Sequence, residues 1–315
     1  MLFGLITLAV FGLVALRFPQ FATPAALAEL LDDTAILILL ALGQMFVLLT
    51  RGVDLSIASN LALSGMLAAL VSRQAPELGV TGAVLIAIAS GILLGACNGI
   101  LVWKLRLPPI VVTLGTLSIY RGLVFLLTSG AWVNSHELAP AFLSATRVTF
   151  LGLTVVAWLA MLSALACWAA LRYTRFGRDL LASGGNPQAA AYVGIDAGRL
   201  QCAAFTLAGG LAGLCGYLWV SRYAVAYTDI ALGFELQVIA ACLIGGVSIA
   251  GGVGGVVGVM LGCLFLGIVK NALPIAGISP FWQLAMNGLV ITVAVILNAR
   301  ADRSQRRAIV VEETP

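Results

Sequence analysis

Charged side chains are scarce in this sequence. Asp, Glu, Lys and Arg make up 10% of its 315 residues, whereas a soluble domain contains roughly 25%. Because lipid offers no hydrogen-bond partners, the backbone of such a chain must form helices or a closed barrel. The apolar runs are unbroken, whereas barrel strands alternate polar and apolar residues over about ten positions. The sequence therefore predicts an all-α polytopic membrane protein.

Patterns typical of catalytic and metal sites are also missing. The chain has one histidine and six cysteines, and each cysteine lies inside an apolar run without a CxxC or His-paired spacing. We therefore expect buried free thiols and no metal site. No nucleophile, base and orienting group occur together, so we expect no enzymatic activity. No GxxxxGK[ST] motif occurs, so the glycines do not indicate a phosphate-binding loop, and we expect this chain to bind no cofactor.

Turn-forming and charged clusters divide the chain into about ten apolar runs, each close to the roughly 20 residues that cross a bilayer. Nine or eleven crossings remain alternatives. Only Arg51 and Gly52 separate the second run from the third, which leaves a broken or re-entrant helix open. The runs are 1–16, 34–50, 53–72, 78–103, 108–128, 150–171, 200–221, 234–249, 252–269 and 281–298.

The basic residues indicate the orientation of the chain. With a cytoplasmic N-terminus, the cytoplasmic loops contain Arg51, Lys104, Arg106, Arg172, Arg175, Arg178, Arg199, Arg300, Arg303, Arg306 and Arg307. The outer loops contain only Arg17, Arg73, Arg147, Arg222 and Lys270. This asymmetry satisfies the positive-inside rule and predicts that both termini are cytoplasmic. We expect one transmembrane domain over residues 1–299 and a basic cytoplasmic tail over 300–315. The net charge of +4 does not indicate a nucleic-acid partner, because the basic residues form no single patch.

One cytoplasmic loop, residues 172–199, is long and polar. Within it, Asn186 is a favourable N-cap and Pro187 suits the first helical position. Residues 188–193 favour a helix, and Gly194 can terminate it. The sequence therefore predicts a two-turn helix parallel to the membrane surface.

Four motifs, in order, resemble the ribose-type branch of ABC importer permeases. Residues 184–195 (GGNPQAAAYVGI) match the coupling-loop pattern GxNxxAAxxxGI of that family. Residues 44–56 resemble a stretch that ends in GGIDLS, with Arg51 in place of the first glycine. Residues 108–122 resemble its PxIVxTLGT segment with a following RG, and residues 235–252 its ELxxIAA run with paired glycines. Residues 49–51, 221–227 and 270–274 are most similar to rhamnose and autoinducer-2 permeases.

The resemblance implies a type II, vitamin B12-importer-like architecture in a bacterial inner membrane. It also implies three protein partners: a cytoplasmic ABC ATPase that binds ATP and Mg, a second permease subunit and a periplasmic sugar-binding protein. The loop helix would dock into the ATPase through an alanine face and pass its motion to the spanning helices. The implied coupling residues are Gly185, Asn186, Pro187, Ala189, Ala190 and Gly194.

Three charged residues lie within or at the ends of apolar runs, where a central charge costs about 2.5–3.5 kcal/mol. Arg121 lies in the middle of a run. It either faces a pathway or pairs with an acid, or else it fixes helix packing or reaches an interface. Asp54 and Glu235 lie near run ends, where helix capping is favoured over contact with a solute.

Small residues recur at every fourth position from residue 246 to 262, and such a stripe allows another helix to approach closely. Its glycines are Gly246, Gly254, Gly258 and Gly262. The neighbouring helix can belong to this chain or to a second permease subunit. Aromatic and amide residues that could contact a sugar, or could instead anchor the chain at an interface, are Tyr120, Asn134, Tyr223, Tyr227, Asn271, Trp282 and Asn287.

The leading hypothesis is the permease subunit of an importer for a small sugar, driven by a separate ATPase. An autoinducer-2 permease is one alternative. An ion-coupled secondary transporter is another, but that class is expected to have coupling charges near the midplane and repeated halves. A membrane scaffold subunit is a third, and it would not need the loop helix.

Overall fold

The computed structural model describes residues 2–277, 282, 285, 288–289 and 292. A helix forms over every predicted apolar run up to residue 275, whereas the run 281–298 and the tail 300–315 lie outside the continuous described part. The long helices are α1 (Leu2–Arg17), α2 (Pro24–Leu49), α3 (Ile57–Gln74), α4 (Gly79–Leu105), α5 (Pro109–Thr128), α7 (Val155–Tyr173), α10 (Ala197–Tyr223), α11 (Phe234–Ile244) and α12 (Val256–Ile275).

Short elements connect these helices. They are the 3-10 turns η1 (Pro19–Ala22), η2 (Pro76–Leu78) and η3 (Ser135–Glu137), the helices α6 (Pro140–Ser144), α8 (Arg175–Gly185) and α9 (Pro187–Tyr192), and a hairpin of β1 (Thr149–Phe150) and β2 (Leu153–Thr154). The strands pair antiparallel, Thr149 opposite Thr154.

Five of the described segments are long and apolar enough to cross a membrane. They are Pro76–Leu105, Pro109–Thr128, Val155–Tyr173, Ala197–Tyr223 and Val256–Ile275. The prediction of an all-α polytopic membrane protein is therefore confirmed. The count of ten spans and the type II architecture stay predictions.

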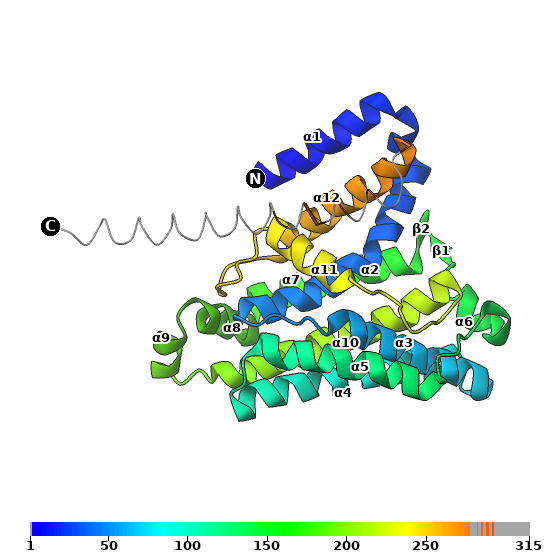
Figure 1. The fold of residues 1–315 in the computed structure, drawn as a ribbon. Helices are drawn as coiled ribbons and strands as arrows, with labels where there is room; N and C mark the ends of the chain where they lie inside the picture. Colours follow the sequence, from blue (N-terminus) through cyan, green and yellow to red (C-terminus); the bar gives the residue numbers. More distant parts are fainter. Residues whose placement is uncertain (1, 278–281, 283–284, 286–287, 290–291, 293–315) are drawn as a thin grey trace.

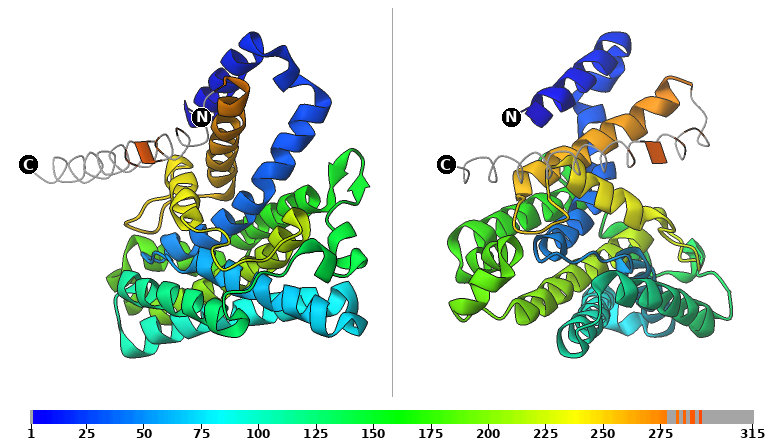
Figure 2. Two further views of the ribbon diagram at one scale, coloured as in Figure 1. Left: turned by 45° about the vertical axis from the view of Figure 1, so that its right-hand side comes forward. Right: turned by 60° about the vertical axis from the view of Figure 1, so that its left-hand side comes forward.

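Helix α2 forms the centre of the fold. Every residue from Thr34 to Leu49 is buried, and α2 packs against α7, α10, α11 and α12. Figure 1 shows α3, α4, α5 and α10 side by side in one layer, with α1 and α12 on the other side of α2. The turned views in Figure 2 show the same two groups separated by α2. The apolar sequence of α2 thus faces protein rather than lipid.

The start of α2 differs from the prediction, which placed it at residue 34. The helix begins at Pro24, after Thr23, whose side chain accepts a hydrogen bond from the Ala26 backbone. Asp32 and Asp33 resembled a loop in the sequence, but both pair with Arg222 at the end of α10. Because these charges are compensated, they remain within a helix.

Helices α4 and α10 touch through their backbones. A Cβ added at Gly95 would lie 2.3 Å from the Phe205 carbonyl oxygen, and one at Gly209 would lie 2.3 Å from the Gly91 carbonyl oxygen. Only glycine permits such an approach, as in other tightly packed membrane helices. This backbone contact between α4 and α10 was not predicted from the sequence, although Gly91, Gly95 and Gly99 recur at every fourth position of α4.

The predicted stripe of small residues does not lie on one helix. Helix α11 ends at Ile244, not at residue 249, because the chain turns at Gly246 (φ 83°). Gly254, with φ 151°, lies in the loop before α12. Only Gly258 and Gly262 are helical, and they meet α11, where a Cβ at Gly262 would lie 2.1 Å from the Ala241 carbonyl oxygen. The close packing is therefore between neighbouring helices of one chain.

The loop after α5 contains a small ionic contact. Glu137 accepts a 2.8 Å hydrogen bond from the Asn134 backbone and pairs with Arg73 at 3.2 Å, which together hold the pKa of Glu137 below its usual value. We expect Glu137→Gln to lower the melting temperature slightly at neutral pH. Because the folded pKa is lowered, this difference is present above about pH 4.3 and disappears in stronger acid. Thermal unfolding in detergent, at neutral pH and in acid well below about pH 4.3, measures the difference in melting temperature between the variant and the wild type. An equal difference under the two conditions would contradict the assignment.

Candidate coupling and transport sites

The loop 172–199 contains the predicted short helix. The Asn186 side chain accepts a 3.0 Å hydrogen bond from the Ala189 backbone, Pro187 opens α9, and Gly194 adopts φ 83° just beyond its end. The position, cap and termination of this helix are therefore confirmed. Helix α8 was not predicted from the sequence. It is amphipathic, and its buried residues Gly177, Leu180 and Gly184 recur every three to four positions.

Of the two alanines expected on the contact face of α9, Ala189 is exposed and Ala190 is buried. The Ala190 side chain is only 2% exposed and faces the body of this chain. Tyr192 and Val193 are instead 92% and 75% exposed. Large apolar side chains so exposed at the end of a polar loop indicate a contact surface. The contact of Ala190 with a partner stays a prediction, whereas Tyr192 and Val193 add a large exposed apolar surface at the end of α9.

Arg51 connects the break between α2 and α3 to the start of α9. Its Nε donates to the Gly184 carbonyl oxygen at 2.7 Å, and its Nη2 donates to the Gly185 carbonyl oxygen at 2.9 Å. These carbonyls belong to the last turn of α8, directly before Asn186. Hydrogen bonds from a charged group are stronger than neutral ones. Arg51 thus joins the end of α8 to the end of the buried helix α2.

A third segment meets the same point. The Gly252 backbone donates to the Leu49 carbonyl oxygen at 3.0 Å. A Cβ at Gly184 would lie 1.8 Å from that same oxygen and 2.5 Å from the Gly252 nitrogen. The backbones of the α2 end, the α8 end and the α11–α12 loop are therefore in direct contact. We call this contact, formed by Leu49, Arg51, Gly184, Gly185 and Gly252, the junction.

Asp54 lies in the same break but is buried. Its carboxylate accepts hydrogen bonds from the Ser56 backbone at 2.8 Å and the Ser56 hydroxyl at 2.6 Å, which supports the start of α3. Asn98 donates to the Ser56 hydroxyl at 2.8 Å, and Tyr120 donates to the Leu94 carbonyl oxygen at 2.8 Å. These contacts place Asp54 and Tyr120 in a polar network that joins α3, α4 and α5. Tyr120 is thus a packing residue here.

Arg121 supports an irregular segment of backbone. Its Nη1 donates to the carbonyl oxygens of Thr228 at 3.1 Å and Ile230 at 2.6 Å, in the stretch that precedes α11. Glu235 lies in the first turn of α11. Within the described residues, Arg121 Nε and Glu235 Oε2 are buried without a hydrogen-bond partner. Arg121 therefore fixes the approach to α11, and no ion pair with Glu235 is present in the described part.

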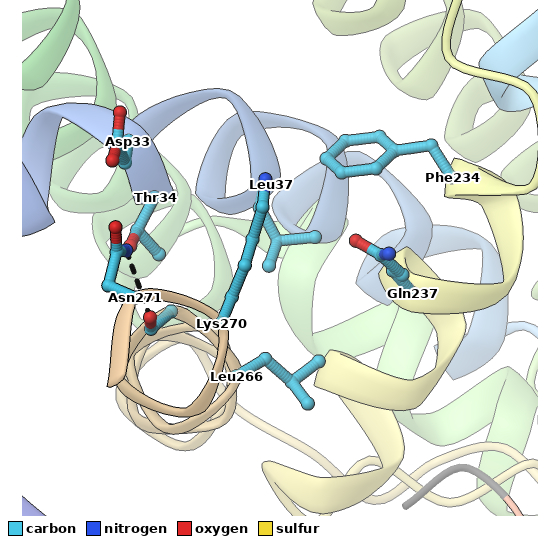
Figure 3. Close-up of a pocket in the computed structure, with 9 residues that line it drawn as sticks. Asp33, Thr34, Leu37, Phe234, Gln237, Leu266, Lys270 and Asn271 are labelled. Atoms are coloured by element: carbon cyan, nitrogen blue, oxygen red, sulfur yellow. Dashed lines mark hydrogen bonds between the residues drawn. The ribbon is translucent and has the colours of Figure 1, made fainter. Parts of the chain in front are cut away.

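A narrow polar cleft lies between α2, α11 and α12 (Figure 3). Asp33 of α2, Gln237 of α11, and Lys270 and Asn271 of α12 line it, together with the ring of Phe234. Figure 3 shows the Lys270 side chain between Asp33 and Asn271 on one side and Phe234 and Gln237 on the other. Asn271 is the one sugar-contact candidate that lies in this cleft.

The other sugar-contact candidates lie elsewhere. Asn134 belongs to the capped turn at η3, Tyr223 packs on Trp219, and Tyr227 packs on Trp132. Trp282 is 64% exposed, whereas Asn287 lies outside the described residues. Searching the described residues finds no group of three or more His, Cys, Asp or Glu side chains placed to hold a metal ion.

Similarity to known proteins shows the family to which this chain belongs. Residues 26–295 match the family model described as the branched-chain amino acid transport system permease component. The chain is 37% identical to the ribose import permease protein RbsC of Bacillus subtilis over 91% of this chain and 89% of the relative. It is 35% identical to RbsC of Escherichia coli K12, over 92% and 91% of the two chains.

The autoinducer 2 import system permease protein LsrC of Salmonella paratyphi B is 34% identical, over 89% of this chain and 80% of the relative. No solved structure matches the chain. The family match covers most of the sequence, including every helix from α2 to α12. This chain therefore belongs to the family of branched-chain amino acid transport system permease components, within its ribose-type branch.

Proposed function

We propose that this chain is the permease subunit of an ABC importer that moves a small sugar inward, driven by a separate ATPase. The chain is a multi-pass inner-membrane permease with sugar-import relatives, and those relatives support a sugar as the cargo. ATP and Mg would bind the ATPase. A periplasmic binding protein would deliver the sugar, and a second permease subunit would complete the pathway.

The observation that carries this proposal is the junction. A surface helix can transmit force only if it is firmly attached to the elements that must move. Here the residues directly before α9 contact the ends of two spanning segments, through Arg51 and through the backbone of Gly184 and Gly252. Exposed Tyr192 and Val193 at the other end of α9 would contact the ATPase. Motion of α9 would then displace α2, α3 and α12 together.

Uptake by the reconstituted complex tests this function. The permease, its ATPase and its binding protein are placed in liposomes, and entry of labelled ribose is measured with ATP or with a non-hydrolysable analogue. We expect uptake only with hydrolysable ATP and the ATPase. Uptake by the permease alone, driven by an ion gradient, would instead indicate a secondary transporter and overturn the proposal.

Autoinducer 2 is the second candidate cargo, supported by the similarity to the LsrC permease. Because binding proteins select the cargo in the proposed arrangement, the same liposomes can be loaded with ribose-type or autoinducer-type binding proteins. Competition between ribose and autoinducer 2 for uptake then shows which of the two is the better cargo. We expect ribose to be the better substrate, since the ribose permeases match a larger share of both chains.

A further inference from the structure

Helix α11 is too short to cross a membrane. Its 11 residues extend about 16 Å, roughly half of a 30 Å hydrocarbon core. The preceding residues 224–233 are not helical. At membrane depth, irregular backbone persists only where protein groups or a water-filled cavity satisfy it. Arg121 satisfies two of these carbonyls, at Thr228 and Ile230. The first turn of α11 therefore borders a polar region.

The cleft of Figure 3 begins at that turn. It brings together polar side chains that remain accessible, since Lys270 is exposed and Gln237 and Asn271 are half-buried. Within the described residues, Gln237 and Lys270 have no hydrogen-bond or ion partner. Asn271 donates its amide to Gly267 at 3.0 Å, so its amide oxygen remains free to accept. These groups are therefore available to a polar ligand at the cleft.

The cleft lies far from the junction. Asp33, which lines it, pairs with Arg222 in the last turn of α10. Helix α10 begins close to α9 and has 27 residues, so its two ends are about 40 Å apart. The cleft is therefore at the end of the bundle opposite the coupling helix, where an imported solute enters.

We propose that this cleft is a binding subsite for a neutral polyol, such as a sugar, on its way through the protein. This inference rests on the proposed import function. The Phe234 ring would cover an apolar sugar face, Gln237 and Asn271 would exchange hydrogen bonds with hydroxyls, and Lys270 and Asp33 would donate and accept, respectively. The cavity volume is about 20 Å³, enough for one water. Sugar entry thus requires α11 to move from α12, as alternating access demands.

The first test measures access of water to the cleft. Gln237→Cys and, as a lipid-facing control, Leu93→Cys (64% exposed) are each labelled from outside with a charged, membrane-impermeant thiol reagent. The unmodified protein gives the background from its six free cysteines. We expect Gln237→Cys to react at least about tenfold faster than Leu93→Cys, since such reagents modify the hydrated thiolate. An equal or slower rate would overturn the proposal.

The second test measures ribose uptake. Gln237→Leu keeps the volume but removes the amide, and we expect the KM for ribose to rise or the rate to fall by about tenfold, the scale of a lost buried hydrogen bond. ATPase binding and basal hydrolysis should stay unchanged. Leu236→Ala, next to it on the exposed side of α11, is the matched control and should behave as wild type.

The results of these tests distinguish a failure of the cleft as a sugar subsite from a failure of the proposed import function. Normal uptake by Gln237→Leu defeats the subsite but leaves the import function intact. An equal loss in Gln237→Leu and Leu236→Ala indicates a structural role of α11 and also defeats the subsite. Failure of the wild-type complex to take up ribose defeats the import function, whereas thiol labelling reports on the cleft independently of uptake.

Discussion

Replacing Tyr192 with Ala together with Val193 with Ser is expected to lower ATP-driven ribose uptake by about a hundredfold. Both side chains are highly exposed at the end of α9, and an interface Tyr buried by a partner commonly contributes about 2 kcal/mol or more. Their loss should release the ATPase from the permease. Uptake in liposomes and co-purification of the ATPase with the permease measure the effect.

Tyr223→Ala provides the matched control. Tyr223 is 47% exposed at the end of α10, about 40 Å from the end of that helix that follows α9, so its removal deletes an apolar surface away from α9. We expect normal ATPase binding in this variant. Equal losses in both variants would show that the ATPase does not dock on α9 specifically.

Arg51→Gly is expected to reduce the sugar moved per ATP hydrolysed by about tenfold, within the usual range of coupling between sites. The substitution removes both hydrogen bonds to the last turn of α8. The relief of backbone strain should offset part of this loss of stability, because Arg51 has a φ of 64°, which glycine adopts without strain. ATPase docking should be retained, since Tyr192 and Val193 remain. Parallel measurements of uptake, hydrolysis and thermal unfolding check these expectations.

The chain offers a close control for that variant. Arg106 also has a positive φ, 54°, at the end of α4, but its side chain is exposed and makes no contact with the junction. Arg106→Gly should relieve the same backbone strain and leave the transport ratio unchanged. Arg51→Lys keeps the charge but lacks the planar geometry with two donors. We therefore expect it to retain part of the sugar transport per ATP hydrolysed. A wild-type ratio in Arg51→Gly would contradict the role of Arg51.

Local chemistry explains what could be predicted from the sequence. The cap at Asn186, the proline at position 187 and the turn at Gly194 act within a few residues, so the bounds of α9 followed directly. The apolar runs likewise located the long helices. The direction in which Ala190 faces depends on the packing of the whole loop, and no local pattern encodes it.

Contacts between distant segments explain what could not be predicted. The junction joins Leu49, Gly184 and Gly252, which are far apart in the chain, and single glycines carry no sign of their partners. Asp32 and Asp33 suggested a loop because their compensating charge, Arg222, lies on another helix. Gln237 had no motif around it, and only the meeting of three helices placed it beside Lys270 and Asn271.

The central claim is that a partner ATPase drives this permease through α9. A photo-crosslinking residue at position 192 in the complete transporter complex tests it most directly. Irradiation should join the permease to the ATPase, and the yield should change between the ATP-bound and nucleotide-free states because α9 moves with its partner. A crosslinker at position 223, at the far end of α10, should give no such product. Absence of an ATPase adduct at position 192 in a complex that transports ribose would contradict the account.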